Sequence, residues 1–458
     1  MHDRKQGAAA PPPRPPTQRG MDADVTDSAG TPGDDETPQA EEADTASETP
    51  AVAPSAPPAR RKKRHWLRWT AAGVSLVVLA GAGAGWWYYD KLDANIKTDL
   101  TAAEELRAYE KERPTPLVVN AQNILLIGSD SRSGSNKKYG RDEGTQRSDT
   151  TILLHLSADR QRATAMSIPR DLMVQIPACH KADNTLSEPQ FAQFNWAFEF
   201  GGTACTIRTV EKLTGIRIDH QMVIDFNGFK DMVDAVDGVE ICLTKPINDT
   251  EAHLKLPAGR QTLRGEQALG FVRARHSIGN GSDTERMGRQ QQFLGALVKK
   301  VQSSGVLLNP TRLLPVLDAA TKSLTTDPGL DSLKDLYDLT RRVRDIPTDQ
   351  VQFLTLPRES YAYDANRDQL VEPDAENLFA QLRTDVPIKV SPTPPATDAA
   401  SGDDSADYSS DDGSSDGEYS EDEYAYDGDW SGDEKPGRRA PRPGPTFHGT
   451  SAAVGMCG

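Results

Sequence analysis

A run of 21 residues without a charged side chain, WTAAGVSLVVLAGAGAGWWYY at 69–89, constrains this chain more than any other feature. At about 1.5 Å of rise per residue, a helix of this length spans roughly 30 Å, the thickness of the hydrocarbon core of a bilayer. A signal peptide is disfavoured because a long polar segment precedes the run. Aromatic side chains stand at both ends, as is typical of transmembrane helices. The sequence therefore predicts one transmembrane helix at 69–89.

The residues just before this run indicate its direction. Six lysine and arginine residues lie within 60–68. Short basic clusters beside a span remain in the cytoplasm, so we predict a cytoplasmic N-terminus and an extracellular chain from Asp90 onward. We interpret 60–68 as a basic juxtamembrane topology signal and expect no nucleic-acid partner.

Both ends of the chain are polar and low in complexity. Residues 1–59 contain 11 prolines and 11 acidic residues, and residues 391–434 contain 15 acidic residues with no lysine or arginine. Such segments cannot bury a core. We therefore predict a disordered cytoplasmic segment at 1–59 and a disordered acidic tail at 391–458. A charged, helical stalk at 90–116 would lead from the membrane to one folded domain at 117–390.

The four cysteines are consistent with an extracellular domain, where disulfides persist. Sequence alone cannot determine how Cys179, Cys205, Cys242 and Cys457 pair. A bridge between Cys179 and Cys205 would pin the loop segment between them, and we predict this disulfide. We expect Cys242 to be buried and Cys457 to be unpaired in a mobile tail.

Short apolar, β-branched runs alternate with helical patterns from residue 123 onward. A strand at 123–127 and a hairpin at 150–157 and 162–168 precede a predicted helix at 190–200. Later, 271–276 is predicted to be extended. Strands that alternate with helices indicate an α/β layered domain.

Acidic and arginine side chains lie where these elements end. Asp130 follows the first strand, Asp149 opens the next, and Arg170 closes a third. In an extended segment Arg273 and Arg275 would point to the same side.

On the following helix, Arg286, Arg289 and Gln290 share one face behind a Ser282–Glu285 capping pattern. A helix N-terminus is a natural anion site.

This set of side chains suits phosphate chemistry. Arginine binds phosphate oxygens with two parallel hydrogen bonds, and carboxylates hold Mg²⁺, which shares its oxygen ligands with phosphates. Surface ion pairs are the alternative reading of the same charges. The sequence has neither a GxxxxGK[ST] loop nor a GxSxG nucleophile motif.

Several segments resemble the LytR-CpsA-Psr (LCP) family of cell-envelope proteins in order and register over 117–305. They are NILLIGSDSR, RSDTTILLHL, ATAMSIPRDLMVQIP, FNWAFEFGG, IDHQMVIDFNGFKDMVDAVDGVEICL and GEQALGFVRARHSIGNGSDTERMGRQQQFL. The resemblance implies a three-layer α-β-α domain with a central mixed sheet, preceded by one transmembrane helix. It also implies a hydrophobic groove for a polyprenyl pyrophosphate lipid, lined by some of the aromatic side chains between Phe191 and Phe226.

The activity implied by the resemblance is Mg²⁺-dependent phosphotransfer, in which a glycopolymer passes from a polyprenyl pyrophosphate lipid to peptidoglycan. The implied metal-associated acids are Asp130 and Asp149, and the implied pyrophosphate-binding side chains are Arg147, Arg170, Arg273, Arg275 and Arg286. We assign further substrate contacts to Arg132, Gln193, Asn195, Arg289 and Gln290. Many members have lysine where this chain has Gln193, so one cation is missing here.

Two other functions fit the same sequence. Water in place of a sugar hydroxyl would make the protein a polyprenyl pyrophosphate phosphatase. A non-catalytic envelope regulator is the second alternative, although a binding protein would not need the metal-associated acids.

Overall fold

The computed structural model describes residues 65–130, 148–181, 183–274, 283–303, 310–392 and 446–454. The chain divides into two compact units, 1–68 and 69–458, and the first of them is described only where helix α1 (His65–Asp93) begins. Within the described part, α1 is the one helix that is long and apolar enough to cross a membrane, over Arg68–Asp93. Apolar side chains within the predicted membrane span, including Val74 and Leu79, are exposed, as a membrane-spanning helix requires.

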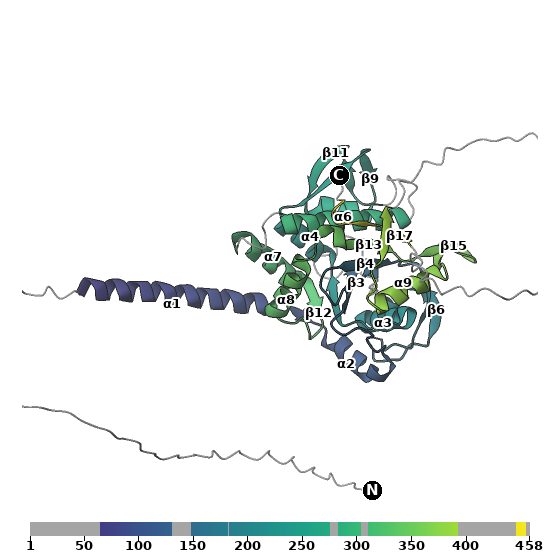
Figure 1. Cartoon of the computed structure of the whole chain (residues 1–458), viewed down its shortest axis with the longest axis horizontal. Helices are drawn as coiled ribbons and strands as arrows, with labels where there is room; N and C mark the ends of the chain where they lie inside the picture. The colour runs from purple at the N-terminus through teal and green to yellow at the C-terminus, as the bar shows by residue number, and fades with distance from the viewer. Residues whose placement is uncertain are drawn as a thin grey trace, which may run out of the picture. The chain divides into compact units, whose positions relative to one another are not determined.

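A mixed β-sheet forms the centre of the second unit (Figure 1). Among the described residues it has nine strands, in the order β1-β12-β7-β2-β3-β4-β13-β17-β16. In that order the strands are Lys97–Thr98, Leu324–Thr326, His220–Ile224, Gln122–Ser129, Ser148–Leu156, Ala163–Ile168, Val351–Thr355, Thr446–Ser451 and Lys389–Pro392. The sheet contains parallel pairs, such as β2 with β7, and antiparallel pairs, such as β2 with β3.

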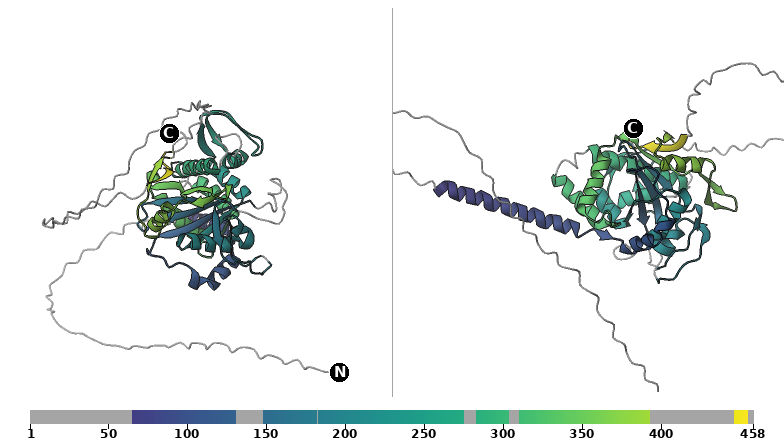
Figure 2. Two further views of the ribbon diagram at one scale, coloured as in Figure 1. Left: turned by 90° about the vertical axis from the view of Figure 1, so that its right-hand side faces the viewer. Right: turned by 60° about the horizontal axis from the view of Figure 1, so that its bottom comes forward.

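Helices cover both faces of this sheet (Figure 2). Successive residues of a strand point to opposite faces. Leu125 and Ile127 accordingly pack toward α3 (Trp196–Thr214) and α9 (Asp374–Arg383). Ile124 packs on the other side, in a core that includes side chains of the helices α6 and α8. Those two helices span Asp283–Ser303 and Leu333–Arg344. The predicted three-layer α-β-α arrangement with a central mixed sheet is confirmed.

A third apolar core lies beside the sheet, under two small hairpins. One hairpin pairs β8 (Val239–Leu243) with β11 (Gly259–Leu263), and the other pairs β9 (Ile247–Asp249) with β10 (Leu254–Leu256). Their inward side chains pack with Phe271 and Phe293. The remaining helices of this region are α4 (Phe226–Ala235), α5 (Gly265–Arg273) and α7 (Pro310–Ser323).

The segment predicted as a stalk, 90–116, is instead part of the folded domain. β1 pairs with β12 in the central sheet, and helix α2 (Leu100–Ala108) buries Ala102 and Leu106 in the same core as α3. Arg113 donates a 2.7 Å hydrogen bond to Glu211 of α3. The high charge of this segment suggested a solvated helix, but its few apolar side chains fall on one buried face.

The predicted disordered tail also contains an ordered part. β17 lies between β13 and β16, and its Phe447 is 4% exposed, whereas the next side chain, His448, faces solvent. Gly449 is required here, because an added Cβ would lie 2.2 Å from the backbone oxygen of Phe353. The prediction of disorder is therefore wrong for Thr446–Ser451, whose one large apolar side chain, Phe447, follows a low-complexity segment and gives too short a pattern to indicate a strand.

The predicted disulfide between Cys179 and Cys205 is present, with 5.5 Å between the Cα atoms. It joins the chain after β5 (Met173–Ile176) to α3, and Gly201 allows this close approach. A Cβ on Gly201 would lie 2.8 Å from the backbone oxygen of His180. Cys242 is half-buried, which corrects the expectation that it is buried, and it is disulfide-bonded. Cys457 lies outside the described residues.

Candidate functional site

An ion pair joins the start of β3 to the residues that follow β4. These strands are antiparallel neighbours in which Thr151 lies opposite Ile168, so Asp149 and Arg170 emerge at the same edge of the sheet. Nη1 of Arg170 lies 3.2 Å from Oδ1 of Asp149, and its Nε donates a 3.0 Å hydrogen bond to Oδ2 of Asp171. The guanidinium is therefore held between two carboxylates while remaining 24% exposed.

The hairpin that follows brings two more predicted residues to this edge. β6 (Gln190–Gln193) pairs with β5, and Nε2 of Gln193 donates a 2.6 Å hydrogen bond to Oδ1 of Asp171. The backbone N–H of Asn195 donates a 3.0 Å bond to the carbonyl of Arg170. This pairing corrects the predicted helix at 190–200, because α3 begins only at Trp196 and the residues before it are held by β5.

Two buried polar atoms at the start of α3 have no hydrogen-bond partner within the described part of the chain. They are Oδ1 of Asn195, an acceptor, and Nε1 of Trp196, a donor. Asn195 is 4% exposed, and a buried polar group without a partner costs free energy. A ligand hydroxyl could donate to Oδ1 of Asn195, and a hydroxyl or phosphoryl oxygen could accept from Nε1 of Trp196.

Asp130 reaches the same edge from the neighbouring strand. It follows Ser129, the last residue of β2, which lies opposite Ser148 of β3 beside a register shift. Asp130 is half-buried. The structure therefore places both predicted metal-associated acids at adjoining strand ends. Of the remaining predicted residues, Arg132, Arg147 and Arg275 lie outside the described residues.

The other predicted arginines belong to α5 and α6. Arg273 is the last residue of α5 rather than part of a strand, which corrects the extended segment predicted at 271–276 over its described residues. Its guanidinium carbon lies 4.5 Å from the centre of the Phe226 ring. Gln290 donates a 3.1 Å bond to the carbonyl of Val272, and Arg289 donates to the carbonyl of Ala274.

These contacts fix the end of α5 against the first turns of α6. Burial lowers the pKa of Arg289 from its ordinary value, with partial compensation by Glu285 and Asp249. Arg286, one turn earlier, is only 5% exposed. The two buried guanidinium groups therefore concentrate positive charge in the first turns of α6.

Sequence reasoning missed Asp171 and Arg367 as members of the site. Asp171 receives hydrogen bonds from Arg170 and Gln193, and Nη1 of Arg367 lies 4.0 Å from its Oδ1. Asp171 directly follows Arg170 in the sequence Pro169-Arg170-Asp171, and this position could have identified it as a member of the site. Arg367 is separated from the other residues by a long stretch of sequence, and no local pattern connects it to them.

The donor set at this edge fits Mg²⁺. Among the described residues, no group of three or more His, Cys, Asp or Glu side chains is placed to hold a metal. Mg²⁺ does not need one, since it commonly binds through one or two carboxylates together with substrate phosphates and water. The Asp149 carboxylate, the nearby Asp130 and the unsatisfied Oδ1 of Asn195 are all oxygen ligands of the kind it prefers.

The aromatic side chains near the site differ in exposure. Phe194 and Phe198 are buried core residues, Trp196 and Phe200 meet edge to face at 5.9 Å, and Phe191 is 48% exposed. The prediction that some of these residues line a lipid groove stays a prediction.

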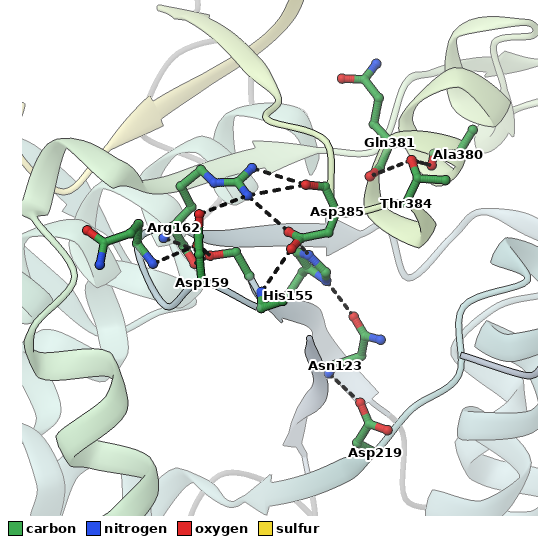
Figure 3. Close-up of polar contacts among 12 residues, drawn as sticks. Asn123, His155, Asp159, Arg162, Asp219, Ala380, Gln381, Thr384 and Asp385 are labelled. Atoms are coloured by element: carbon green, nitrogen blue, oxygen red, sulfur yellow. Dashed lines mark hydrogen bonds and ion pairs between the residues drawn. The ribbon is translucent and has the colours of Figure 1, made fainter. Parts of the chain in front are cut away.

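A buried polar cluster occupies the other end of β3 (Figure 3). Nδ1 of His155 lies 2.8 Å from Oδ1 of Asn123, and Nε2 lies 3.2 Å from Oδ1 of Asp385. Arg162 also pairs with Asp385, at 3.3 Å. A cavity of about 60 Å³ adjoins this cluster. It lies away from Asp149, and its contacts tie the end of α9 to the sheet rather than forming part of the candidate site.

Comparison with known proteins places the chain among relatives of one family. The model of the LytR_cpsA_psr family matches residues 92–384. The chain is 37% identical over 270 residues to the "probable cell wall biosynthesis protein LcpB" of Corynebacterium glutamicum, covering 57% of this chain and 61% of that protein. It is 29% identical over 251 residues to the polyisoprenyl-teichoic acid–peptidoglycan teichoic acid transferase TagT of Bacillus subtilis, covering 53% of this chain and 73% of that protein. A solved LytR-Csp2A-Psr enzyme from Actinomyces oris is 22% identical with a TM-score of 0.46, covering 59% of this chain and 93% of that structure.

Proposed function

Given that the chain belongs to the LytR_cpsA_psr family, we propose that it transfers a glycopolymer from a polyprenyl pyrophosphate lipid to peptidoglycan. The observation that carries the proposal is the linked set of Asp149, Arg170, Asp171 and Gln193 at one edge of the sheet. The relatives named as transferases act on teichoic acid and peptidoglycan, which supports this choice of donor and acceptor.

Each residue of this set has a role in the proposed reaction. Arg170 binds an oxygen of the donor's pyrophosphate, and Asp171 and Gln193 hold the guanidinium in position. Asp149 and Asp130, with the side-chain Oδ1 of Asn195, would hold Mg²⁺, which when bound neutralises charge on the phosphates. Arg273 and Arg286 supply further positive charge from the α5–α6 side.

The reaction follows from positioning and charge stabilisation. The acceptor's hydroxyl oxygen forms a bond to the phosphorus nearest the glycan, the bridging P–O bond breaks, and polyprenyl phosphate leaves with the proton that the hydroxyl gives up. The transfer is direct, through positioning of donor and acceptor, rather than through a covalent enzyme intermediate.

The proposed topology places this site outside the membrane. The basic residues before α1 favour a cytoplasmic N-terminus. A phosphatase reporter that is active only outside the cell, fused after Asp93, should be active. Activity of a cytoplasm-dependent reporter at that position would contradict the orientation.

The full chain, reconstituted in nanodiscs with a lipid-linked glycopolymer and peptidoglycan fragments, tests the function directly. We expect glycopolymer covalently attached to peptidoglycan and free polyprenyl phosphate in equal amounts. Release of glycopolymer phosphate to water with no attachment would identify a phosphatase instead. Binding without turnover at any Mg²⁺ concentration would favour a regulator.

A further inference from the structure

Three aromatic side chains form an exposed cluster beside the candidate site. Tyr361 lies between the other two, with its ring centre 6.1 Å from that of Phe191 and 5.4 Å from that of Tyr363. Tyr363 is 88% exposed and Phe191 is 48% exposed. The rings are tilted by 56° and 57° to one another, so they present separate faces rather than a closed stack. Adjacent exposed aromatic rings of this kind are typical of binding surfaces.

The cluster belongs to a hairpin that is fixed to the site. β14 (Arg358–Tyr361) pairs with β15 (Asp364–Leu370), and the backbone N–H of Asp368 donates a 3.1 Å bond to the carbonyl of Asp171. Arg358 pairs with the Asp368 carboxylate. These contacts attach the hairpin directly to the residue that positions Arg170.

Phe191 makes the second connection. It lies on β6 two residues before Gln193, and residues two apart on a strand point to the same side. Gln193 bonds Asp171, whereas Phe191 contacts Tyr361. The aromatic cluster is therefore continuous with the phosphate-binding set rather than a separate surface.

The surroundings of the rings indicate which ligand they suit. The Asp364 and Arg367 side chains lie 3.7 Å apart on the same hairpin, and Gln369 donates a 2.7 Å bond to Glu359. A lipid chain requires an enclosed apolar groove, which a surface rimmed by charged and amide groups does not provide. Sugar rings combine an apolar C–H face, which stacks on aromatic rings, with hydroxyls that bond to such polar groups.

We propose that Phe191, Tyr361 and Tyr363 form the subsite that binds the acceptor glycan strand next to the reacting phosphate. This inference rests on the proposed function, because it names the acceptor's position at the same site. Sugar rings stacked here would place a neighbouring hydroxyl of the strand on the Asp171–Arg170 side of the hairpin.

Glycan binding can be measured without any donor. The probe is a soluble β-1,4-linked N-acetylglucosamine oligosaccharide, titrated into the full chain in nanodiscs and followed by calorimetry. We expect Tyr363→Ala and Tyr361→Ala each to weaken binding about tenfold, and Tyr363→Phe to bind as the wild type does because it keeps the ring. Tyr337→Ala is the matched control, since Tyr337 is 49% exposed but lies on α8.

The transfer assay supplies a second measurement of acceptor binding, the KM for peptidoglycan fragments. Tyr363→Ala should raise the KM for peptidoglycan fragments about tenfold and leave the KM for the lipid donor unchanged. Unchanged oligosaccharide binding in both alanine variants, or no binding by the wild type, would overturn the subsite. A raised donor KM instead would identify the cluster as a lipid contact and also overturn it. Oligosaccharide binding that depends on the tyrosines, with no transfer by the wild type, would support the subsite and count against the proposed transferase activity.

Discussion

Arg170 and Asp149 form an ion pair of 3.2 Å that connects the end of one central strand to the start of its neighbour. Both side chains are partly exposed, at 24% and 32%, so the pair contributes little to stability. Arg170 can therefore leave the Asp149 carboxylate and bind a phosphate with little loss of folding free energy. Asp171 holds the other side of the guanidinium and keeps it oriented during that exchange.

Replacing Arg170 tests the phosphate-binding assignment. Arg170→Ala should lower the transfer rate about 100- to 1,000-fold, because it removes a charge-stabilising donor from the reacting phosphate. The thermal unfolding midpoint should change little. Arg260→Ala serves as the control, since Arg260 is an exposed, ion-paired arginine on β11. Transfer at the wild-type rate by Arg170→Ala in the purified lipid-donor assay would show that the assignment is wrong.

Replacing Asp149 tests the metal-binding assignment. Asp149→Asn keeps the size of the side chain but removes the charge that Mg²⁺ prefers. We expect the Mg²⁺ concentration for half-maximal transfer to rise at least about tenfold. Asp364→Asn, on the neighbouring hairpin, should leave it unchanged. Equal Mg²⁺ titrations of Asp149→Asn and the wild type would place the metal elsewhere.

Much of this architecture was predictable from local patterns. Short apolar, β-branched runs identified β2, β3 and β4, and the charged residues at their ends included Asp149 and Arg170. The failures involve long-range pairing. Residues 190–193 have a helical pattern but pair with β5. Arg273 ends helix α5, whose Val272 carbonyl accepts a hydrogen bond from Gln290 of α6. Arg367 joins Asp171 from a distant hairpin, and only the fold brings the two together.

The strand after the acidic segment provides a stability test. Phe447 is buried in the core that also contains Leu354 and Phe379. Phe447→Ala should lower the free energy of unfolding by about 3–5 kcal/mol, as expected for a large buried side chain. His448→Ala, its exposed neighbour, should change it by less than about 0.5 kcal/mol. Urea denaturation of both variants measures the difference, and equal stability would mean that β17 does not belong to the folded domain in solution.

The cluster around His155 predicts a pH dependence. Burial lowers the pKa of His155 below its usual 6.5, and Asp385 opposes this only in part. The unfolded chain then binds the proton more readily than the folded one, so the resulting stability is complete above about pH 6.5 and falls as the pH drops below it. Thermal unfolding should therefore show a lower midpoint at pH 5.5 than at pH 7.5.

Titration of a single variant isolates this effect. In His155→Gln, the drop in the unfolding midpoint between pH 7.5 and 5.5 should be smaller, because the part due to His155 is gone. This holds whatever the substitution does to stability at pH 7.5. His448→Gln is the control, because His448 is exposed on β17. An unchanged slope in His155→Gln would assign the titration to other groups.

The junction between α1 and the domain has a consequence for where the protein can work. Oδ1 of Asp93, the last residue of α1, accepts a 2.7 Å hydrogen bond from the N–H of Leu333, and Lys97 already pairs with Thr325 in the sheet. No flexible spacer separates the apolar helix from the domain. With α1 in the bilayer, the domain would stay at a fixed distance from the membrane surface. It would not reach glycan farther out, as a domain on a long flexible linker could. Only the innermost, most recently made layer of glycan would then come within its range.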